Sequence, residues 1–151
     1  MSNACQHLAQ VFAQDIPLSQ VMGVQVTHWS NTELQLTFPL QPNINHQASM
    51  FGGSMYCAAV LAGWGWLHLR LKEEGIETTH IVVQSGQIDY PRPIFHNSII
   101  SVCSIPEDRL WQRFLNTYRK HGKARIELVS RVLTENNEDG AVLTGQFVLH
   151  Q

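Results

Sequence analysis

Charged residues are scarce in this sequence. Lysine, arginine, aspartate and glutamate make up 15% of its 151 residues, whereas about 25% is typical of soluble domains. The formal net charge is −2, and lysine and arginine form no long run. Nucleic-acid binding is therefore disfavoured, because contacts to phosphates need clustered cations. The low charge content also favours an oligomer in which a partner covers part of the surface.

The cysteines are few, and signals of secretion and membrane insertion are lacking. The three cysteines, Cys5, Cys57 and Cys103, are odd in number and widely spaced, which is typical of reduced thiols in the cytoplasm. No basic stretch followed by an apolar one marks the N-terminus, so we expect no secretory signal. The longest weakly charged run, 52–69, contains glycines, a serine and a histidine, which favours a buried helix over a membrane span. We therefore expect a cytoplasmic protein without a membrane segment.

The apolar periodicity predicts one domain, residues 1–151, of α+β structure. Helical spacing predicts helices over 4–14 and 53–74, and a third that opens at Pro106 and ends at Gly122. Strand patterns predict six strands, at 24–29, 33–38, 80–90, 98–103, 124–133 and 142–150. Strands grouped around one segregated helix favour an antiparallel sheet. Because the 53–74 helix is apolar on nearly every face, it must be enclosed, and we expect five or six strands wrapped around it.

The segment before the central helix carries the strongest functional signal. Residues 43–54 read NINHQASMFGGS, a polar loop that ends in a glycine pair at the start of a helix. A helix N-terminus presents unsatisfied N–H groups and the positive end of the helix dipole. Glycines there let a ligand approach the backbone closely. The pattern indicates an oxyanion site, where backbone N–H groups hold an oxygen that becomes negative during a reaction.

Four short motifs occur together in the chain. They are Asn43-x-Asn45, MFGGS at 50–54, AGWG at 62–65, and Asp89-Tyr90-x-x-Pro93 at a strand end. Together they resemble the hotdog-fold thioesterases, in particular the thioesterase family found as the carboxy-terminal domain of some acetyltransferase-fused proteins. The resemblance covers most of the chain and implies a hotdog fold. It also implies homodimers or dimers of dimers with an acyl tunnel at the subunit interface, substrates carried on coenzyme A or acyl carrier protein, and no metal or organic cofactor.

The chain departs from the thioesterases that it resembles. Related enzymes often carry His-Gly-Gly where this chain has Phe51 before the glycine pair, and a catalytic carboxylate about two turns into the helix. The matching region here, near Val60, has no carboxylate, and none occurs between Gly53 and Leu71. The asparagine that these enzymes carry six residues before the position of Phe51 falls on Asn45. The resemblance thus implies that the amide is retained while the acid is missing.

Three functions are compatible with these residues. The leading hypothesis is hydrolysis of acyl-CoA or acyl carrier protein thioesters in fatty acid metabolism, with the carbonyl oxygen at the glycine pair and a water positioned by Asn45. The missing acid motivates an alternative, decarboxylation of a malonyl thioester, which needs a clamp for the developing enolate but no carboxylate to activate water. The other alternative is a non-catalytic module that binds an acyl carrier and shields its thioester.

Four residues are candidates for catalysis, and each has a structural alternative. Gly53 can offer its N–H to the thioester carbonyl, or only permit the turn into the helix. Asn45 can orient water or donate its amide N–H to the carbonyl, or hold the loop in an Asx turn. His46 can act as a general base, since imidazole titrates near ~6.5, or be a solvated loop residue. Asp89 can face the site, or fix the proline-rich corner through a hydrogen bond.

Six further residues are expected at the substrate-binding surface: Asn43, Phe51, Gly52, Ser54, Trp64 and Arg92. Asn43 can instead shape the loop, and Ser54 can cap the helix. Trp64 can line an acyl pocket or pack in the core. Arg92 can meet a phosphate of coenzyme A or be a solvated surface residue.

Two other kinds of chemistry are disfavoured. Cys57 lies in an apolar helix without a visible histidine partner, where a thiol behaves as a small hydrophobic group. None of the eight histidines shows the pairing four residues apart, around a glutamate, that zinc peptidases use. We therefore expect neither a cysteine nucleophile nor a metal site.

Overall fold

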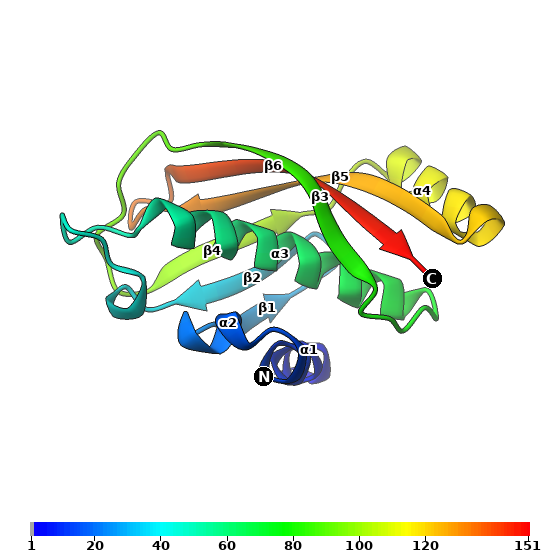
Figure 1. Cartoon of the computed structure of the whole chain (residues 1–151), viewed down its shortest axis with the longest axis horizontal. Helices are drawn as coiled ribbons and strands as arrows, with labels where there is room; N and C mark the ends of the chain where they lie inside the picture. Colours follow the sequence, from blue (N-terminus) through cyan, green and yellow to red (C-terminus); the bar gives the residue numbers. More distant parts are fainter. Residues whose placement is uncertain (1) are drawn as a thin grey trace.

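The computed structural model describes residues 2–151, in which a six-stranded antiparallel sheet curves around a long helix (Figure 1). The helices are α1 (Asn3–Asp15), α2 (Pro17–Val21), α3 (Gly52–Glu73) and α4 (Asp108–His121), with a 3₁₀ turn, η1 (Gln41–Asn43). The strands are β1 (Gln25–Trp29), β2 (Glu33–Phe38), β3 (Ile81–Asp89), β4 (Ile99–Ser104), β5 (Lys123–Leu133) and β6 (Asp139–His150). Their order is β1-β2-β4-β5-β6-β3, so β1 and β3 form the edges. The predicted α+β class, six strands and enclosed helix are confirmed.

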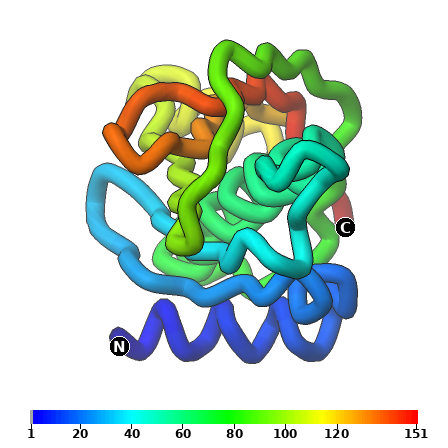
Figure 2. Tube along the Cα trace, turned by 90° about the vertical axis from the view of Figure 1, so that its left-hand side faces the viewer, coloured from blue at the N-terminus to red at the C-terminus, as the bar shows by residue number. Residues whose placement is uncertain are grey.

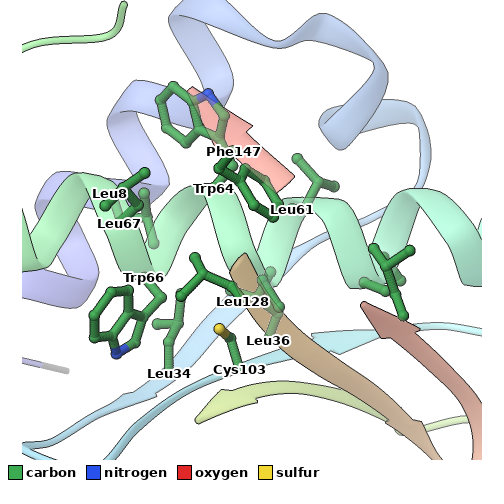
Figure 3. Packing of buried hydrophobic residues seen from close by; sticks show 14 of the residues in the cluster. Leu8, Leu34, Leu36, Leu61, Trp64, Trp66, Leu67, Cys103, Leu128 and Phe147 are labelled. Carbon is green, nitrogen blue, oxygen red and sulfur yellow. The ribbon is translucent and has the colours of Figure 1, made fainter. Parts of the chain in front are cut away.

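Helix α3 is the centre of the core. Every residue from Leu61 to Leu69 is buried, and nine residues make more than two turns, so all faces of the helix are covered there. Side chains of the sheet project toward it, among them Leu34, Leu36 and Leu128 (Figure 3). The sequence predicts that this helix is enclosed. A single chain is enough to enclose the second half of α3.

Two glycines let neighbouring side chains approach α3 closely. A Cβ at Gly63 would lie 2.6 Å from the ring of Phe147, and one at Gly65 would lie 2.8 Å from Leu8 and Leu34. A larger residue at either position would have to displace these side chains, which favours glycine although it costs roughly 1 kcal/mol in a helix interior relative to alanine. The neighbours come from β6, α1 and β2 of the same chain.

The helices end at the glycines that the sequence predicts, but α4 does not begin at the predicted proline. Gly75 and Gly122 follow α3 and α4 with positive φ angles of 80° and 72°, which is the left-handed conformation that glycine adopts without strain. α4 begins at Asp108 with Glu107 as its N-cap, two residues after the predicted start at Pro106. The sequence did not predict α2, because its five residues are too few to show a helical period.

Helices α1 and α3 are joined through two histidines. Nε2 of His7 lies 2.9 Å from Nε2 of His68, and Nδ1 of His68 lies 2.8 Å from the carbonyl oxygen of Thr78. Because that carbonyl only accepts, Nδ1 of His68 carries a proton, and the Nε2–H of His7 donates to Nε2 of neutral His68. The His68 ring is 5% exposed and stacks on Trp64.

No helix within residues 2–151 is long and apolar enough to cross a membrane.

Stability should fall in mild acid because of His68. Burial is the main reason why the pKa of His68 is lowered from 6.5; His7 and Lys72 add to this effect, while the Thr78 carbonyl and Asp15 oppose it. The unfolded chain therefore takes up this proton at a higher pH than the folded chain does. The His68 contribution to the free energy of unfolding is present above pH ~6.5 and is lost as pH falls toward the lowered pKa.

Urea unfolding at pH 7.5 and 5.5 measures this effect. We expect the loss of stability between these pH values to be smaller in His68→Gln than in the wild type, and unchanged in His46→Gln, which alters an exposed histidine. An identical loss in wild type and His68→Gln would contradict the prediction.

Candidate active site

The N-terminus of α3 presents backbone donors without partners. The helix begins at Gly52, and its N-cap, Phe51, makes no side-chain capping bond. Within residues 2–151, the N–H groups of Gly52, Gly53 and Ser54 have no hydrogen-bond acceptor outside the helix, and the first N–H groups of a helix have none inside it. The predicted capping role of Ser54 is wrong, because Ser54 is the third residue of the helix. The three N–H donors and the positive end of the helix dipole are thus both available at the N-terminus of α3.

Aromatic rings flank the glycine pair on two sides. The ring of Phe51, which is 57% exposed, would lie 2.5 Å from a Cβ at Gly53. The ring of Tyr90 would lie 3.6 Å from a Cβ at Gly52, and its hydroxyl donates to the Gly52 carbonyl at 2.9 Å. Partial burial is the main reason why the pKa of Tyr90 is raised, and nearby Tyr56 and Cys57 add to it, so the hydroxyl stays protonated as this bond requires.

A hollow of about 310 Å³ opens beside the start of α3. It is lined by Ser49, Met50, Gly52, Met55, Tyr90, Arg92 and Pro93. The loop before α3 is tied to the segment after β3, since the N–H of Met50 donates to the carbonyl of Ile94 at 2.8 Å. Figure 2 looks onto this end of the molecule, where the turquoise loop leads into α3. The structure therefore brings the glycine pair, Tyr90 and Arg92 together.

Asn43 anchors the loop from inside. It is 2% exposed, and its Nδ2 donates to the carbonyls of Met22 (2.9 Å) and Pro39 (2.8 Å). The backbone carbonyl of Asn43 accepts from the N–H of Phe51 at 2.7 Å. The expectation that Asn43 binds substrate is corrected by this burial: the side chain shapes the loop.

Asn45 forms the Asx turn that the sequence left as one of two alternatives. Its Oδ1 accepts from the N–H groups of Gln47 (2.9 Å) and Ser49 (3.0 Å), and its Nδ2 donates to the Ser49 hydroxyl (2.9 Å). Both lone pairs of Oδ1 are therefore used, and one N–H of the amide is left. Ala48 in this turn has a φ of 64°. The amide holds the loop, and its remaining N–H is the one group that can still donate to a water or to a carbonyl oxygen.

The two titratable candidates are exposed and make no side-chain hydrogen bond or ion pair with residues 2–151. His46 lies in the Asx turn, and Asp89 is the last residue of β3, opposite Val142 of β6. Asp89 thus forms no bond that would fix the proline-rich corner. Its position directly before Tyr90 puts it at the same strand end as the ring that contacts Gly52.

Arg92 is held by the turn between β5 and β6. Its Nε lies 3.2 Å from Oε2 of Glu138, and one guanidinium nitrogen donates to the carbonyl of Asp139 at 3.1 Å. The side chain is 47% exposed and lines the hollow. The pairing comes in addition to the two roles that the sequence suggested, and contact with a phosphate of coenzyme A stays a prediction.

Trp64 and Cys57 lie farther along α3. Trp64 is 7% exposed and donates from Nε1 to the carbonyl of Ile81 at 2.9 Å; eleven residues, or about 16 Å along the helix, separate it from Gly53. Trp64 therefore packs in the core, as its alternative predicted, and does not reach the hollow. Burial raises the pKa of Cys57, which lowers its thiolate fraction and disfavours a nucleophilic role.

Two tyrosines are the site residues that sequence reasoning missed. Tyr90 bonds the start of α3, and Tyr56 lies on the same helix face as Gly52, four residues on. A Cβ at Gly86, in the middle of β3, would collide with the Tyr56 hydroxyl. A glycine inside a strand is a signal of close approach, and together with a tyrosine in the first turns of the helix it would have indicated this contact.

Comparisons with known proteins agree on the kind of molecule. A model of the family described as "Putative thioesterase (yiiD_Cterm)" matches residues 5–151. A crystal structure of a protein of unknown function from Chlorobaculum tepidum is similar at 32% identity and a TM-score of 0.90, over 97% of this chain and 94% of that one. The structure described as a putative thioesterase from Shewanella oneidensis is similar over 100% of both chains, at 26% identity and a TM-score of 0.87.

The fold itself is shared more widely. The PaaI protein of the phenylacetic acid degradation operon of Escherichia coli is 13% identical, with a TM-score of 0.68 over 99% of this chain and 96% of that one. At that identity the likeness concerns the fold alone. The predicted hotdog fold, a sheet wrapped around a long helix, is confirmed.

Replacing Asn45 should separate loop stability from amide chemistry. Asn45→Ala removes three hydrogen bonds, and we expect it to lower the free energy of unfolding by about 1–3 kcal/mol. Asn45→Asp keeps the acceptor for both N–H groups and can accept from the Ser49 hydroxyl, so we expect a change within about 0.5 kcal/mol. Urea unfolding measures both, and limited proteolysis at residues 43–51 reports the local opening. Equal stability of Asn45→Ala and the wild type would contradict the assignment.

Proposed function

This chain belongs to that thioesterase family, and from this membership we propose that it hydrolyses acyl thioesters carried on coenzyme A or on an acyl carrier protein. The coarse class, thioester hydrolysis, follows from the family and from the thioesterase among its similar structures. The observation that carries the proposal is the set of free N–H groups at the start of α3, where a carbonyl oxygen can be held. The three free cysteines support a cytoplasmic location.

The carbonyl oxygen is proposed to bind the N–H of Gly53. Attack on a thioester carbonyl turns its oxygen into an oxyanion, and a preorganised donor stabilises this charge more than it stabilises the substrate. Gly53 is exposed, whereas the Gly52 carbonyl is held by Tyr90. This bond fixes the direction of the first helical turn and therefore of its donors.

The proton acceptor for the attacking water must come from outside the first five turns of α3. The helix has no carboxylate from Gly52 to Leu71, and Oδ1 of Asn45 is already used. We propose Asp89 as the acceptor, because it is an exposed carboxylate at the end of β3 that forms no side-chain hydrogen bond or ion pair within residues 2–151. His46, on the neighbouring loop, is the other candidate of the sequence.

The active form is proposed to be a dimer that pairs through β3. This edge strand is exposed from Val82 to Gln87, with Val82 at 49% and Val83 at 38%, and long exposed edges are normally covered in natural proteins. Beside it, α3 leaves Tyr56, Cys57 and Val60 only partly buried. A second copy placed on β3 by two-fold symmetry would cover both features and give the acyl chain an apolar surface next to the glycine pair.

Decarboxylation of a malonyl thioester is retained as a second candidate. The observation that favours it is the same absence of a carboxylate on α3 beside free N–H donors. Loss of carbon dioxide leaves an enolate whose oxygen the donors can hold, and this reaction needs no activated water.

A thioester panel read by product mass tests these functions. We expect free acid and free thiol from acyl-CoA or acyl carrier protein substrates, and expect kcat to fall about 10²–10³-fold in Gly53→Pro, which removes one N–H where the first helical turn tolerates proline. Gly53→Ala is the matched control, because it crowds Phe51 in the same way and keeps the N–H. Equal losses in both variants would contradict the oxyanion assignment.

The same panel distinguishes the other functions. An acetyl thioester from malonyl substrate would favour decarboxylation, and tight binding without any product would favour a binding module.

The dimer proposal has its own variant pair. Val82→Lys places a charge on the β3 edge, and we expect light scattering to report a monomer and thioester hydrolysis to fall at least about tenfold. Ile105→Lys, at a similar exposure of 46% but at the end of β4, should leave both unchanged. A wild-type protein that is monomeric and active would overturn the pairing.

A further inference from the structure

The cations of this chain are concentrated in one short segment. Six of the ten lysine and arginine residues lie between positions 109 and 125, which include no aspartate or glutamate. They are Arg109, Arg113, Arg119, Lys120, Lys123 and Arg125, and all are exposed. Since the whole chain has a net charge of −2, the rest of the molecule is acidic. This basic segment, 109–125, comprises most of α4 and the start of β5.

A groove runs through the basic segment between α4 and β5. It has a volume of about 430 Å³. Its apolar lining comes from Leu110, which is partly exposed, and from the nearly buried Phe114 and Ile126, and Arg113 and Arg125 lie beside them. Neither arginine forms an ion pair with a carboxylate of residues 2–151. The lining also holds one carboxylate, Glu127, whose Oε1 accepts from Nε2 of Gln146 at 3.1 Å. The groove thus joins a small apolar floor to one carboxylate and to two guanidinium groups that form no ion pair within residues 2–151.

Helix stability explains only part of this charge. Arg119 and Lys120 lie in the last turn of α4, where cations interact favourably with the helix dipole, and Arg119 also lies 3.6 Å from Glu74. Arg113 is in the middle of α4, however, and Lys123 and Arg125 are on β5. The dipole effect falls off within one turn, so it does not account for these three.

The segment is held on a rigid support. Trp111 of α4 packs edge-on against Trp66 of α3 with ring centroids 5.4 Å apart, and the guanidinium carbon of Arg70 lies 5.0 Å from the Trp111 ring. Phe114 and Leu115 are buried beside them. A surface on such an element is already in its final shape, so a partner loses little free energy in ordering it.

We propose that the basic segment and its groove form the docking surface for an acidic, amphipathic helix of the acyl carrier protein that presents the thioester. An apolar floor flanked by cations matches a helix with apolar side chains on one face and carboxylates beside it. The proposal rests on the thioesterase function proposed above and selects one carrier for it. A free coenzyme A has no apolar helix to fill the groove.

The sheet places this surface near the site of the other protomer. Arg125 pairs with Val148 of β6, and Val148 pairs with Val82 of β3, so Arg125 is two strands, or about 10 Å, from the start of the edge strand. Within one chain, α4 lies at the far end from the loop before α3 (Figure 1). If two β3 strands pair antiparallel about their middles, the start of one lies beside the end of the other. Docking on one protomer then delivers the thioester to the glycine pair of its partner.

Two charge-matched double variants test the docking surface. Arg113→Gln/Arg125→Gln removes two positive charges from the groove, while Gln6→Glu/Gln14→Glu makes the same change of net charge on exposed positions of α1. Titration calorimetry with holo-acyl carrier protein at low and high salt gives the Kd, and kcat/KM is measured for one acyl group on the carrier protein and on coenzyme A.

We expect the groove variant to weaken carrier binding and to lower kcat/KM for the carrier substrate at least about tenfold at low salt, with a smaller salt dependence. The α1 variant should match the wild type, and kcat/KM for the coenzyme A substrate should change less than about twofold in both. Unchanged carrier binding, an equal loss on coenzyme A, or binding of heparin as tight as that of the carrier would overturn the proposal. Arginine-dependent carrier binding without hydrolysis of any thioester would overturn the proposed function and leave the docking surface standing.

Discussion

The enclosure of α3 is the constraint on which the remaining structure depends. Nine consecutive residues of this helix are buried on every side, and a helix in that position has to be surrounded by apolar surface. The sheet supplies most of it, α1 and α4 supply the rest, and Gly63 and Gly65 let Phe147 and Leu8 pack directly against the helix backbone. A bulkier side chain at either glycine would push the neighbouring elements away from α3, because protein interiors are packed at near-crystalline density.

The same enclosure decides where chemistry can occur. Inside the sheet, the backbone of α3 is used up in its own hydrogen bonds, so only its first turn offers free N–H groups. The loop before it must therefore end at a fixed place and angle. Asn43 and Asn45 hold the loop with side-chain bonds to the backbone, and Tyr90 holds the first helical carbonyl. Three polar side chains thus serve to position a donor set made of backbone alone.

Much of the fold was predictable from sequence, because apolar spacing and glycine positions report burial and backbone geometry directly. The six strands and the helix ends at Gly75 and Gly122 follow from such local signals. The misses involve contacts between distant segments. Ser54 looked like an N-cap, yet the helix starts earlier, and the hydrogen bond from Tyr90 to Gly52 joins residues 38 positions apart. Asn45 is an example. Orienting a water and holding an Asx turn both call for an asparagine, and only the hydrogen bonds that Oδ1 accepts in the structure show that the turn is formed.

The two sites proposed above lie at opposite ends of the molecule and differ in charge (Figure 1). The residues that line the hollow beside the glycine pair include one charged side chain, Arg92, which is already paired with Glu138, and the proposed proton acceptor, Asp89, lies outside this lining. A donor set for an oxyanion gains from few competing charges, because fixed dipoles act most strongly where water and mobile ions are scarce. The free cations stand instead on α4 and β5, where they remain solvated and can attract a partner over a Debye length of about 10 Å. Recognition by long-range charge needs solvated side chains, whereas catalysis by short-range dipoles needs water to be scarce. The length of α3 therefore suits the proposed functions, because it keeps the basic segment away from the glycine pair within each chain.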